Sequence, residues 1–314
     1  MRVLVFGGSG FLGSALVPLL VGRGHAVTVL TRDLAIAPRI ESMGAASLVG
    51  DLLEPASFAQ KLAGVDVMVL IAQPKIFGTR VTSKRFELLR DQVTRLHANA
   101  LGLAKERGCP IVITSGTAFC THGDEVADET WPFVRIGIAR IGDQVDALME
   151  QVRAAGSPKF VRLLPGQIYG PGGMFATMAK WAREGRNAII GDGNNCIPRI
   201  HVDDCADAYL RAIEKIDALP NGASFIVADD VACTSAAWST ELARLLGLPP
   251  PKKAPRIALL FIRLAVGRLL LETMQMDCRV SNAKLKRELG WQPRYPSYRE
   301  GMAAAVAALG SGLT

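Results

Sequence analysis

Short runs of apolar, mostly β-branched residues alternate along the first half of the chain with longer segments of helical spacing. The runs are mainly apolar and show no regular alternation with polar residues, which is typical of strands covered on both faces. This pattern predicts a parallel sheet flanked by helices, a doubly wound α/β fold. The predicted strands are Arg2–Phe6, Ala26–Leu30, Ala46–Val49, Val65–Ile71, Ile111–Thr114 and Phe160–Leu164.

After Pro165 the pattern changes to loops rich in glycine and proline that separate further helical segments. Ligands of doubly wound folds bind at the carboxyl ends of the strands. We therefore expect residues 1–165 to form the sheet domain and residues 166–314 a smaller, helix-rich substrate lobe at that edge. The predicted helices lie near 174–184, 203–216, 235–246, 256–274, 281–289 and 297–309, and a strand near 225–228 is expected to return to the sheet.

The first predicted strand runs through a glycine-rich turn into an apolar helix. The turn reads Gly7-Gly8-Ser9-Gly10-Phe11-Leu12-Gly13. Gly7 permits a tight turn, Gly10 lets a diphosphate approach the backbone, and Gly13 lets helix and strand pack closely. The diphosphate would lie on free N–H groups at the positive end of the helix dipole. This context predicts a Rossmann-type dinucleotide site, the alternative being a turn that uses glycine for steric reasons alone.

The second predicted strand ends in Thr31-Arg32-Asp33. Proteins that bind NAD(H) usually place a carboxylate at this strand end to bind the ribose hydroxyls. Thr31 takes that place here, and the guanidinium of Arg32 matches a 2′-phosphate in charge and geometry. We therefore expect NADP(H), with NAD(H) less favoured. The alternative leaves Arg32 as a solvated cation and gives the ribose to Asp33.

Other strand ends add candidate contacts to the cofactor. Asp51 closes the third strand with a carboxylate that could accept from an adenine amino group, and the fourth strand ends beside the expected adenosine ribose. Each is equally explicable as a strand end followed by a turn. Together the predicted cofactor-binding residues are Gly7, Ser9, Gly10, Phe11, Leu12, Gly13, Thr31, Arg32, Asp51, Leu52, Ile71, Ala72, Gln73, Thr114 and Pro165.

Composition limits the class of protein. The 314 residues are 49% hydrophobic and 21% charged, as in ordinary globular chains, which excludes a disordered tail or a small disulfide scaffold. The net charge of +7 comes from scattered basic residues with no run of five, so a solvated basic surface is favoured over nucleic-acid binding. Such a surface also suits an anionic cofactor.

The cysteines and the apolar segments bear on location. The six cysteines form no CxxC pair and no tight Cys/His group, so we expect no metal site and no disulfide framework. Free thiols and an amino terminus that opens on a strand pattern favour a cytoplasmic protein without a signal peptide. Residues 257–271 are too short and too charged to span a bilayer, so we expect a buried or interfacial helix and no membrane insertion.

These motifs resemble the extended short-chain dehydrogenase/reductase family, which includes nucleotide-sugar epimerases and dehydratases. The resemblance implies the Rossmann fold, a nicotinamide cofactor and a small-molecule substrate, and it leaves room for a homodimer through two helices of the fold. It covers nearly the whole chain, in the blocks at residues 7–13, 50–52, 114–119, 165–173, 200–209 and 284–302.

The family's catalytic pair is a Tyr and a Lys four residues later, the cation lowering the pKa of the phenol. The sequence contains no Tyr-x-x-x-Lys: its tyrosines at 169, 209, 295 and 298 are followed at that spacing by Gly173, Ile213, Arg299 and Met302. The register places the pair near Ile138 and Gly142 and the family's strand-end hydroxyl near Gly116. The chain is therefore similar to atypical members that keep the dinucleotide site and lose the pair.

Three functions stay open on the sequence. We favour an NADP(H)-dependent oxidoreductase that acts on a small organic molecule, such as a conjugated C=C or an imine, with a non-standard proton donor. The alternatives are an isomerase, epimerase or rearrangement enzyme assisted by the cofactor, and a non-catalytic NADPH sensor. The predicted catalytic residues are Ser115, Thr117 and Tyr169, with Cys120 and Gln167 as further polar candidates.

His201 precedes two carboxylates that could orient its imidazole. The favoured interpretation is structural, with Asp203 or Asp204 capping the helix that follows.

Overall fold

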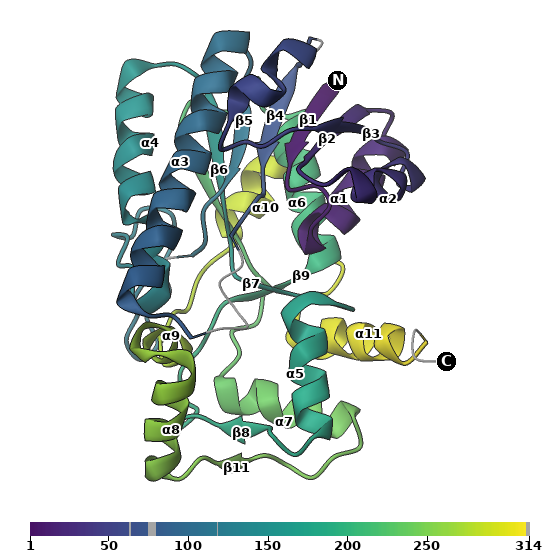
Figure 1. Ribbon diagram of the computed structural model, residues 1–314. Coiled ribbons are helices and arrows are strands. Elements are labelled where there is room, and N and C mark those ends of the chain that lie inside the picture. Colours follow the sequence, from purple (N-terminus) through teal and green to yellow (C-terminus); the bar gives the residue numbers. More distant parts are fainter. Residues whose placement is uncertain (63, 75–79, 118, 312–314) are drawn as a thin grey trace.

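The computed structural model describes residues 1–62, 64–74, 80–117 and 119–311 (Figure 1). Its centre is a seven-stranded sheet in the order β10-β6-β5-β4-β1-β2-β3, with every neighbouring pair parallel. The predicted doubly wound fold is therefore confirmed, including the returning strand. The strands are β1 (Arg2–Phe6), β2 (Ala26–Thr31), β3 (Ala46–Val49), β4 (Val67–Leu70), β5 (Ile111–Thr114), β6 (Phe160–Pro165) and β10 (Ala223–Val227).

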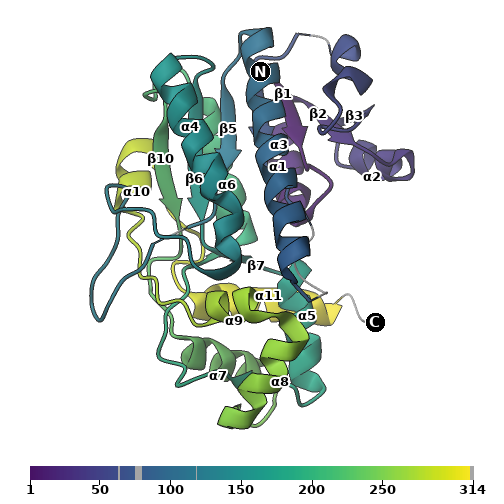
Figure 2. The same ribbon diagram turned by 60° about the vertical axis from the view of Figure 1, so that its left-hand side comes forward.

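Helices cover both faces of the sheet, which is why its strands are mainly apolar on both faces. In β1, Val3 and Val5 belong to the core on one face, and Leu4 and Phe6 to the core on the other. The first core is covered by α1 (Phe11–Gly22), α2 (Ala37–Ser42), α6 (Val202–Glu214) and α10 (Ala283–Leu289). The second is covered by α3 (Ser83–Arg107) and α4 (Asp143–Ala155), which lie side by side in Figures 1 and 2.

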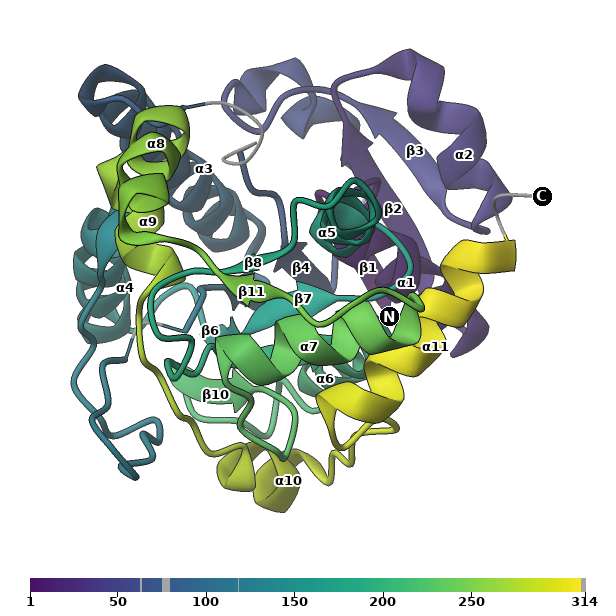
Figure 3. The same cartoon turned by 90° about the horizontal axis from the view of Figure 1, so that it is seen from below.

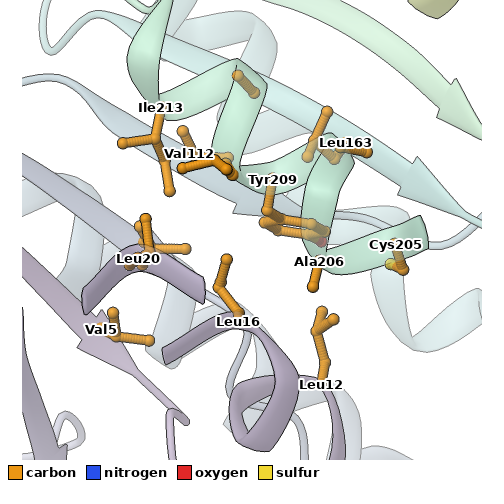
Figure 4. Close-up of a cluster of buried hydrophobic side chains, with 14 of the residues drawn as sticks. Val5, Leu12, Leu16, Leu20, Val112, Leu163, Cys205, Ala206, Tyr209 and Ile213 are labelled. Carbon is orange, nitrogen blue, oxygen red and sulfur yellow. The ribbon is translucent and has the colours of Figure 1, made fainter. Parts of the chain in front are cut away.

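Helix α6 is part of the sheet domain although it follows residue 165. Leu12, Leu16 and Leu20 of α1 meet Ala206, Tyr209 and Ile213 of α6 over the sheet, all of them buried (Figure 4). Together with β10 and α10, this helix brings the second half of the chain back to the sheet. The division of the chain at residue 165 stays a proposal, and its spatial boundary does not follow the order of the sequence.

The remaining helices gather at the carboxyl edge of the sheet, as the view from below shows (Figure 3). They are α5 (Gly173–Arg183), α7 (Ser235–Leu245), α8 (Arg256–Val266), α9 (Arg268–Met274) and α11 (Tyr298–Ser311). Two small parallel ladders accompany them and were not predicted. They pair β7 (Gln167–Tyr169) with β9 (Arg199–His201), and β8 (Ala188–Ile189) with β11 (Lys252–Lys253).

The single helix predicted over 256–274 breaks at Gly267. This glycine has φ +91°, and a Cβ on it would lie 2.5 Å from the carbonyl oxygen of Val81. The break thus lets the lobe approach the start of α3. Neither half reaches across a bilayer, and no other helix in the described part of the chain is long and apolar enough to do so.

Four short 3₁₀ helices complete the described elements. They are η1 (Leu34–Ile36), η2 (Pro55–Ser57), η3 (Ala59–Lys61) and η4 (Gly137–Gly142), and η4 leads directly into α4.

Candidate functional site

The glycine-rich turn joins β1 to α1 at the carboxyl edge. Gly7 has φ +93°, and a Cβ on it would lie 2.6 Å from the amide nitrogen of Ala72 after β4. A Cβ on Gly13 would lie 2.3 Å from the oxygen of Gly8, so helix and turn touch closely. Gly10 precedes α1 without a side-chain cap, and α1 has no acidic residue in its first turn. This backbone cradle fits a diphosphate at the helix amino terminus.

A second glycine loop packs over the start of α1. A Cβ on Gly172 would lie 3.1 Å from the ring of Phe11, and one on Gly173 would lie 3.2 Å from it. The lobe therefore closes over the glycine-rich turn. Within that turn Ser9 is half-buried, whereas the side chain of Leu12 lies in the core, which leaves only its backbone for a dinucleotide.

The three residues at the end of β2 that could decide the choice of coenzyme lie in different environments. Thr31 is buried, and its hydroxyl both donates to the carbonyl oxygen and accepts from the amide of Asp33, each at 3.2 Å. The carboxylate of Asp33 accepts from the amide of Ala35 at 2.9 Å and caps η1. Arg32 is exposed, and no carboxylate of the described residues forms an ion pair with it.

The other predicted adenosine contacts differ in exposure. Asp51 is half-buried, and one of its carboxylate oxygens accepts from the amide of Leu53 at 2.9 Å. The side chain of Leu52 is buried in the core, and its carbonyl accepts from the Asn99 amide at 2.8 Å. Of the polar groups of Leu52, only the backbone amide is thus available to bind the adenine base.

The ends of β4, β5 and β6 follow one another along the same edge of the sheet, and only β4 is next to the strand that leads into the glycine-rich turn. Ile71 and Ala72 are half-buried and Gln73 is exposed. The Thr114 hydroxyl donates to the Leu70 carbonyl at 2.8 Å and lies 2.6 Å from the Tyr209 hydroxyl, so it points toward α6. Pro165 is buried, and its carbonyl accepts from the amide of Thr117 at 3.2 Å.

Ser115 belongs to a charged network that the sequence analysis missed. Arg135 donates through Nη2 to Ser115 Oγ at 2.9 Å, and through Nε and Nη2 to the two oxygens of Asp146 at 2.6 and 2.9 Å. Arg162 donates to the same carboxylate at 3.1 Å. The side chains of Arg135 and Arg162 are only 7% and 12% exposed and that of Asp146 is 25% exposed, so the two guanidinium groups are mostly shielded from water.

The segment to which the sequence register assigns the catalytic pair forms η4. Ile138 is buried, and its amide donates to the Thr273 hydroxyl of α9 at 2.9 Å. A Cβ on Gly142 would lie 2.8 Å from Cζ of Arg135. Helix α9 therefore covers one of these positions and a guanidinium covers the other.

Tyr169 lies at the end of strand β7. It is 1% exposed, and its ring packs against His201 and Trp238. Its hydroxyl donates to Asp229 at 3.0 Å. Burial, followed by the nearby carboxylate, raises the pKa of Tyr169 above its usual value. This environment suits a packing residue, so we leave Tyr169 out of the proposed reaction.

His201 caps α6 itself, in place of the predicted Asp203 or Asp204. Its Nδ1 accepts from the amide of Asp203 at 3.3 Å, because the ring precedes the first turn of the helix. Burial lowers the pKa of His201. Asp204 instead accepts from the amides of Arg294 and Tyr295 at 2.6 and 2.9 Å, which fixes the closing segment of the chain.

In the described part of the chain, no side-chain hydrogen bond is found for the two remaining polar candidates. Cys120 and Gln167 are both half-buried. Burial raises the pKa of the Cys120 thiol, which lowers its nucleophilicity near neutral pH.

Among the cavities lined by described residues, two lie away from the glycine-rich turn. One, of about 20 Å³ beside Arg199 and Asp229, has the size of a water molecule and is too small for a substrate. The other, of about 850 Å³, lies between the start of α3, η4 and the junction of α8 with α9. Its volume suits a small organic ligand. Four arginines line it, namely Arg80, Arg140, Arg263 and Arg268.

Comparisons with known proteins agree with the motifs. A family model described as the NAD dependent epimerase/dehydratase family matches residues 3–228. A 3-diazoavenalumate denitrifying reductase from a Streptomyces species is 29% identical over 96% of this chain and 99% of its own.

Solved structures share the fold. UDP-glucose 4-epimerase from Thermotoga maritima, solved with UDP-glucose, has a TM-score of 0.81 and 19% identity, and covers 100% of both chains. Human epimerase family protein SDR39U1, solved with NADPH, has a TM-score of 0.77 and 23% identity over 98% of this chain and 99% of its own. The family match confirms the resemblance found in the sequence: the chain belongs to the NAD dependent epimerase/dehydratase family.

Proposed function

We propose that the chain is an NADP(H)-dependent reductase of small organic molecules. The end of β2 carries the choice of coenzyme. Asp33, the residue that would bind the ribose of NAD(H), is engaged in capping η1, whereas Arg32 projects into solvent beside it. A guanidinium without an acidic partner suits a 2′-phosphate. The relative solved with NADPH supports the same choice, although other relatives of the fold were solved with NAD.

Different residues at the carboxyl edge would bind different groups of the cofactor. The glycine-rich turn and the start of α1 would bind the diphosphate, Arg32 the 2′-phosphate, and Asp51 the adenine. The bound nicotinamide supplies a hydride to an electrophilic carbon of the substrate. Ser115, which is buried, and Thr117, which is half-buried, follow β5 at the same edge and would offer hydroxyls to the reacting group.

Reduction is favoured over epimerisation by the chemistry of the residues present. Hydride adds to carbon, the electron pair of the multiple bond moves to the neighbouring atom, and that atom takes one proton. A substrate such as a conjugated C=C or an imine needs no phenolate in this step. Relatives named as reductases support this reaction class. A cofactor-assisted isomerase is the second candidate, supported by the family match.

Coenzyme binding and turnover test the proposal separately. Calorimetry of the purified chain with NADPH and NADH is expected to show tighter binding of NADPH. Absorbance of the reduced nicotinamide is then followed with a panel of conjugated carbonyl compounds and imines. Substrate-dependent loss of absorbance supports a reductase, whereas product formed without net loss supports an isomerase. If neither coenzyme binds at millimolar concentration, the proposal is wrong.

We also propose a reducing, cytoplasmic location and a homodimer. All six cysteines are free, which supports the first. Sedimentation equilibrium tests the second.

A further inference from the structure

We propose that Arg135, anchored by Asp146, supplies the cation of the missing catalytic pair and directs the Ser115 hydroxyl toward the reacting atom. The inference rests on the proposed reductase function. Ser115 is then a catalytic residue that touches the substrate, and Arg135 is a positioning residue that acts through it.

The place of the guanidinium is the first argument. A side chain on residue 142 would start where Arg135 already lies, since a Cβ there would be 2.8 Å from Cζ and 2.9 Å from Nη1 of Arg135. The sequence register assigns the Lys of the pair to Gly142. A cation from outside α4 therefore occupies the space into which a side chain at residue 142 would project.

The anchoring of the guanidinium is the second argument. Two hydrogen bonds to the carboxylate of Asp146, at 2.6 and 2.9 Å, fix its plane. A bidentate pair of this kind is charge-assisted and directional. The same Nη2 donates to Ser115 Oγ at 2.9 Å, so the position of the serine hydroxyl is set by Asp146 through Arg135.

The net charge of the network is the third argument. Arg162 also binds Asp146, so two guanidinium groups share one carboxylate beside Ser115. His97 lies next to this group, with Nδ1 2.8 Å from the Val93 carbonyl and Nε2 3.4 Å from the Thr114 carbonyl. Burial lowers the pKa of His97, so the ring is neutral near pH 7. Within the hydrogen-bonded network beside Ser115, positive groups therefore outnumber negative ones.

The direction of the hydrogen bond decides what Ser115 can do. A guanidinium has donors and no acceptor, so the Ser115 O–H cannot donate to Arg135. Its proton is free to point to another acceptor while Oγ is polarised by the cation. In the proposed reduction, Ser115 donates a hydrogen bond to the atom that receives the electron pair. Solvent water supplies the proton that completes the step.

The first test measures the cation without any turnover. Ser115→Cys places a thiol beside Arg135, and its alkylation is followed against pH by mass spectrometry of the peptide containing residue 115. Adding Arg135→Met removes the cation and is expected to raise the thiol pKa by about one unit or more. Adding Arg244→Met instead, at an exposed Arg–Glu pair, serves as the control and is expected to change nothing. An equal pKa in all three proteins would overturn the inference.

The second test uses the active enzyme. Ser115→Ala and Arg135→Met are each expected to lower kcat about 10²- to 10³-fold, the typical effect of losing one donor to a developing anion. The NADPH Kd should stay unchanged. Because both changes act on one hydrogen bond, the double variant should be no worse than either single one. Arg135→Lys should restore part of kcat.

The outcomes separate the inference from the function on which it rests. Additive losses in the double variant, or a loss of kcat matched by lost NADPH binding and thermal stability, would show that Arg135 is only structural. If the thiol pKa shifts as expected but none of the tested substrates leads to oxidation of NADPH, the charged site is supported and the reductase function is contradicted.

Discussion

Arg32 and Asp33 are neighbours at the end of β2, but only the side chain of Asp33 forms a hydrogen bond within the described part of the fold. The carboxylate of Asp33 accepts from the amide of Ala35 in η1, whereas the guanidinium of Arg32 is exposed to solvent. In the proposed function, coenzyme choice would thus depend on the side chain of Arg32, which makes no ion pair with the described residues.

Replacing Arg32 with Ala should weaken NADPH binding by about 1.5–3 kcal/mol, the cost of a lost hydrogen bond to a charged group. NADH binding should change little, because NADH has no 2′-phosphate. Titration calorimetry with both coenzymes checks this, and Arg23→Ala, at an exposed ion pair with Glu214, is the control. Equal losses for the two coenzymes would remove Arg32 from the phosphate site.

Asp229 makes stability depend on pH. Burial, the largest cause, raises its pKa to about 8, whereas the unfolded chain has an ordinary value near 4. Since the folded form holds its proton more tightly, the contribution is complete below about pH 4 and is lost as pH rises through about 8. Asp229→Asn cannot ionise and keeps an acceptor for Tyr169. Urea unfolding should therefore show a smaller fall in free energy with pH in the variant, and parallel pH curves would contradict the assignment.

The sequence predicted Ser115 as a site residue but did not predict its hydrogen-bond partner Arg135. Ser115 follows a predicted strand, so its place at the carboxyl edge could be expected. Arg135 lies 20 residues further on, in a segment without regular structure, and no spacing rule joins the two. The sequence offered only the presence of Arg135 near Gly142, the position at which the register expects the Lys. That the two meet in space could be known only from the tertiary structure.

Helices α1 and α6 form the packing unit on which the cofactor site depends. The start of α1 presents the amides that would hold the diphosphate, and Leu16 in the next turns is fully buried against α6 (Figure 4). Precise placement of the glycine-rich turn therefore depends on packing between two helices far apart in sequence.

Leu16→Ala should lower the free energy of unfolding by about 2–5 kcal/mol, because it leaves a cavity between the two helices. Leu88→Ala on α3 removes the same atoms from a side chain that is 58% exposed, and should cost less than about 0.5 kcal/mol. Urea denaturation measures both. Similar losses in the two variants would contradict the packing described for α1.

The strands of the main sheet were predictable because each is a continuous apolar run bounded by turn residues. The ladders β7–β9 and β8–β11 have only two or three residues a strand and show no such pattern. The break at Gly267 was missed for a related reason: the apolar spacing continues through it, and the approach of Val81 is a tertiary contact.

The whole molecule shields its thiols. Of the six cysteines, five are buried and Cys120 is half-buried, spread over both the sheet domain and the lobe. Their reactivity therefore reports on the integrity of the complete fold and not on one element.

A disulfide reagent should accordingly modify at most one thiol in the native protein, slowly because burial raises the pKa of Cys120, and all six in denaturant. Cys120→Ser should abolish the native reaction and leave five thiols after unfolding. Rapid modification of several thiols under native conditions would contradict the described packing of the lobe.

The position of Arg135 beside Gly142 also limits which substitutions could restore the family's catalytic pair. Installing a phenol by Ile138→Tyr and an amine by Gly142→Lys would not rebuild the common active site of the family, because the new lysine meets a guanidinium and the new ring meets α9. Arg135 and the α9 contact would have to change in the same step. A single substitution at residue 138 or residue 142 is therefore not expected to restore the catalytic pair.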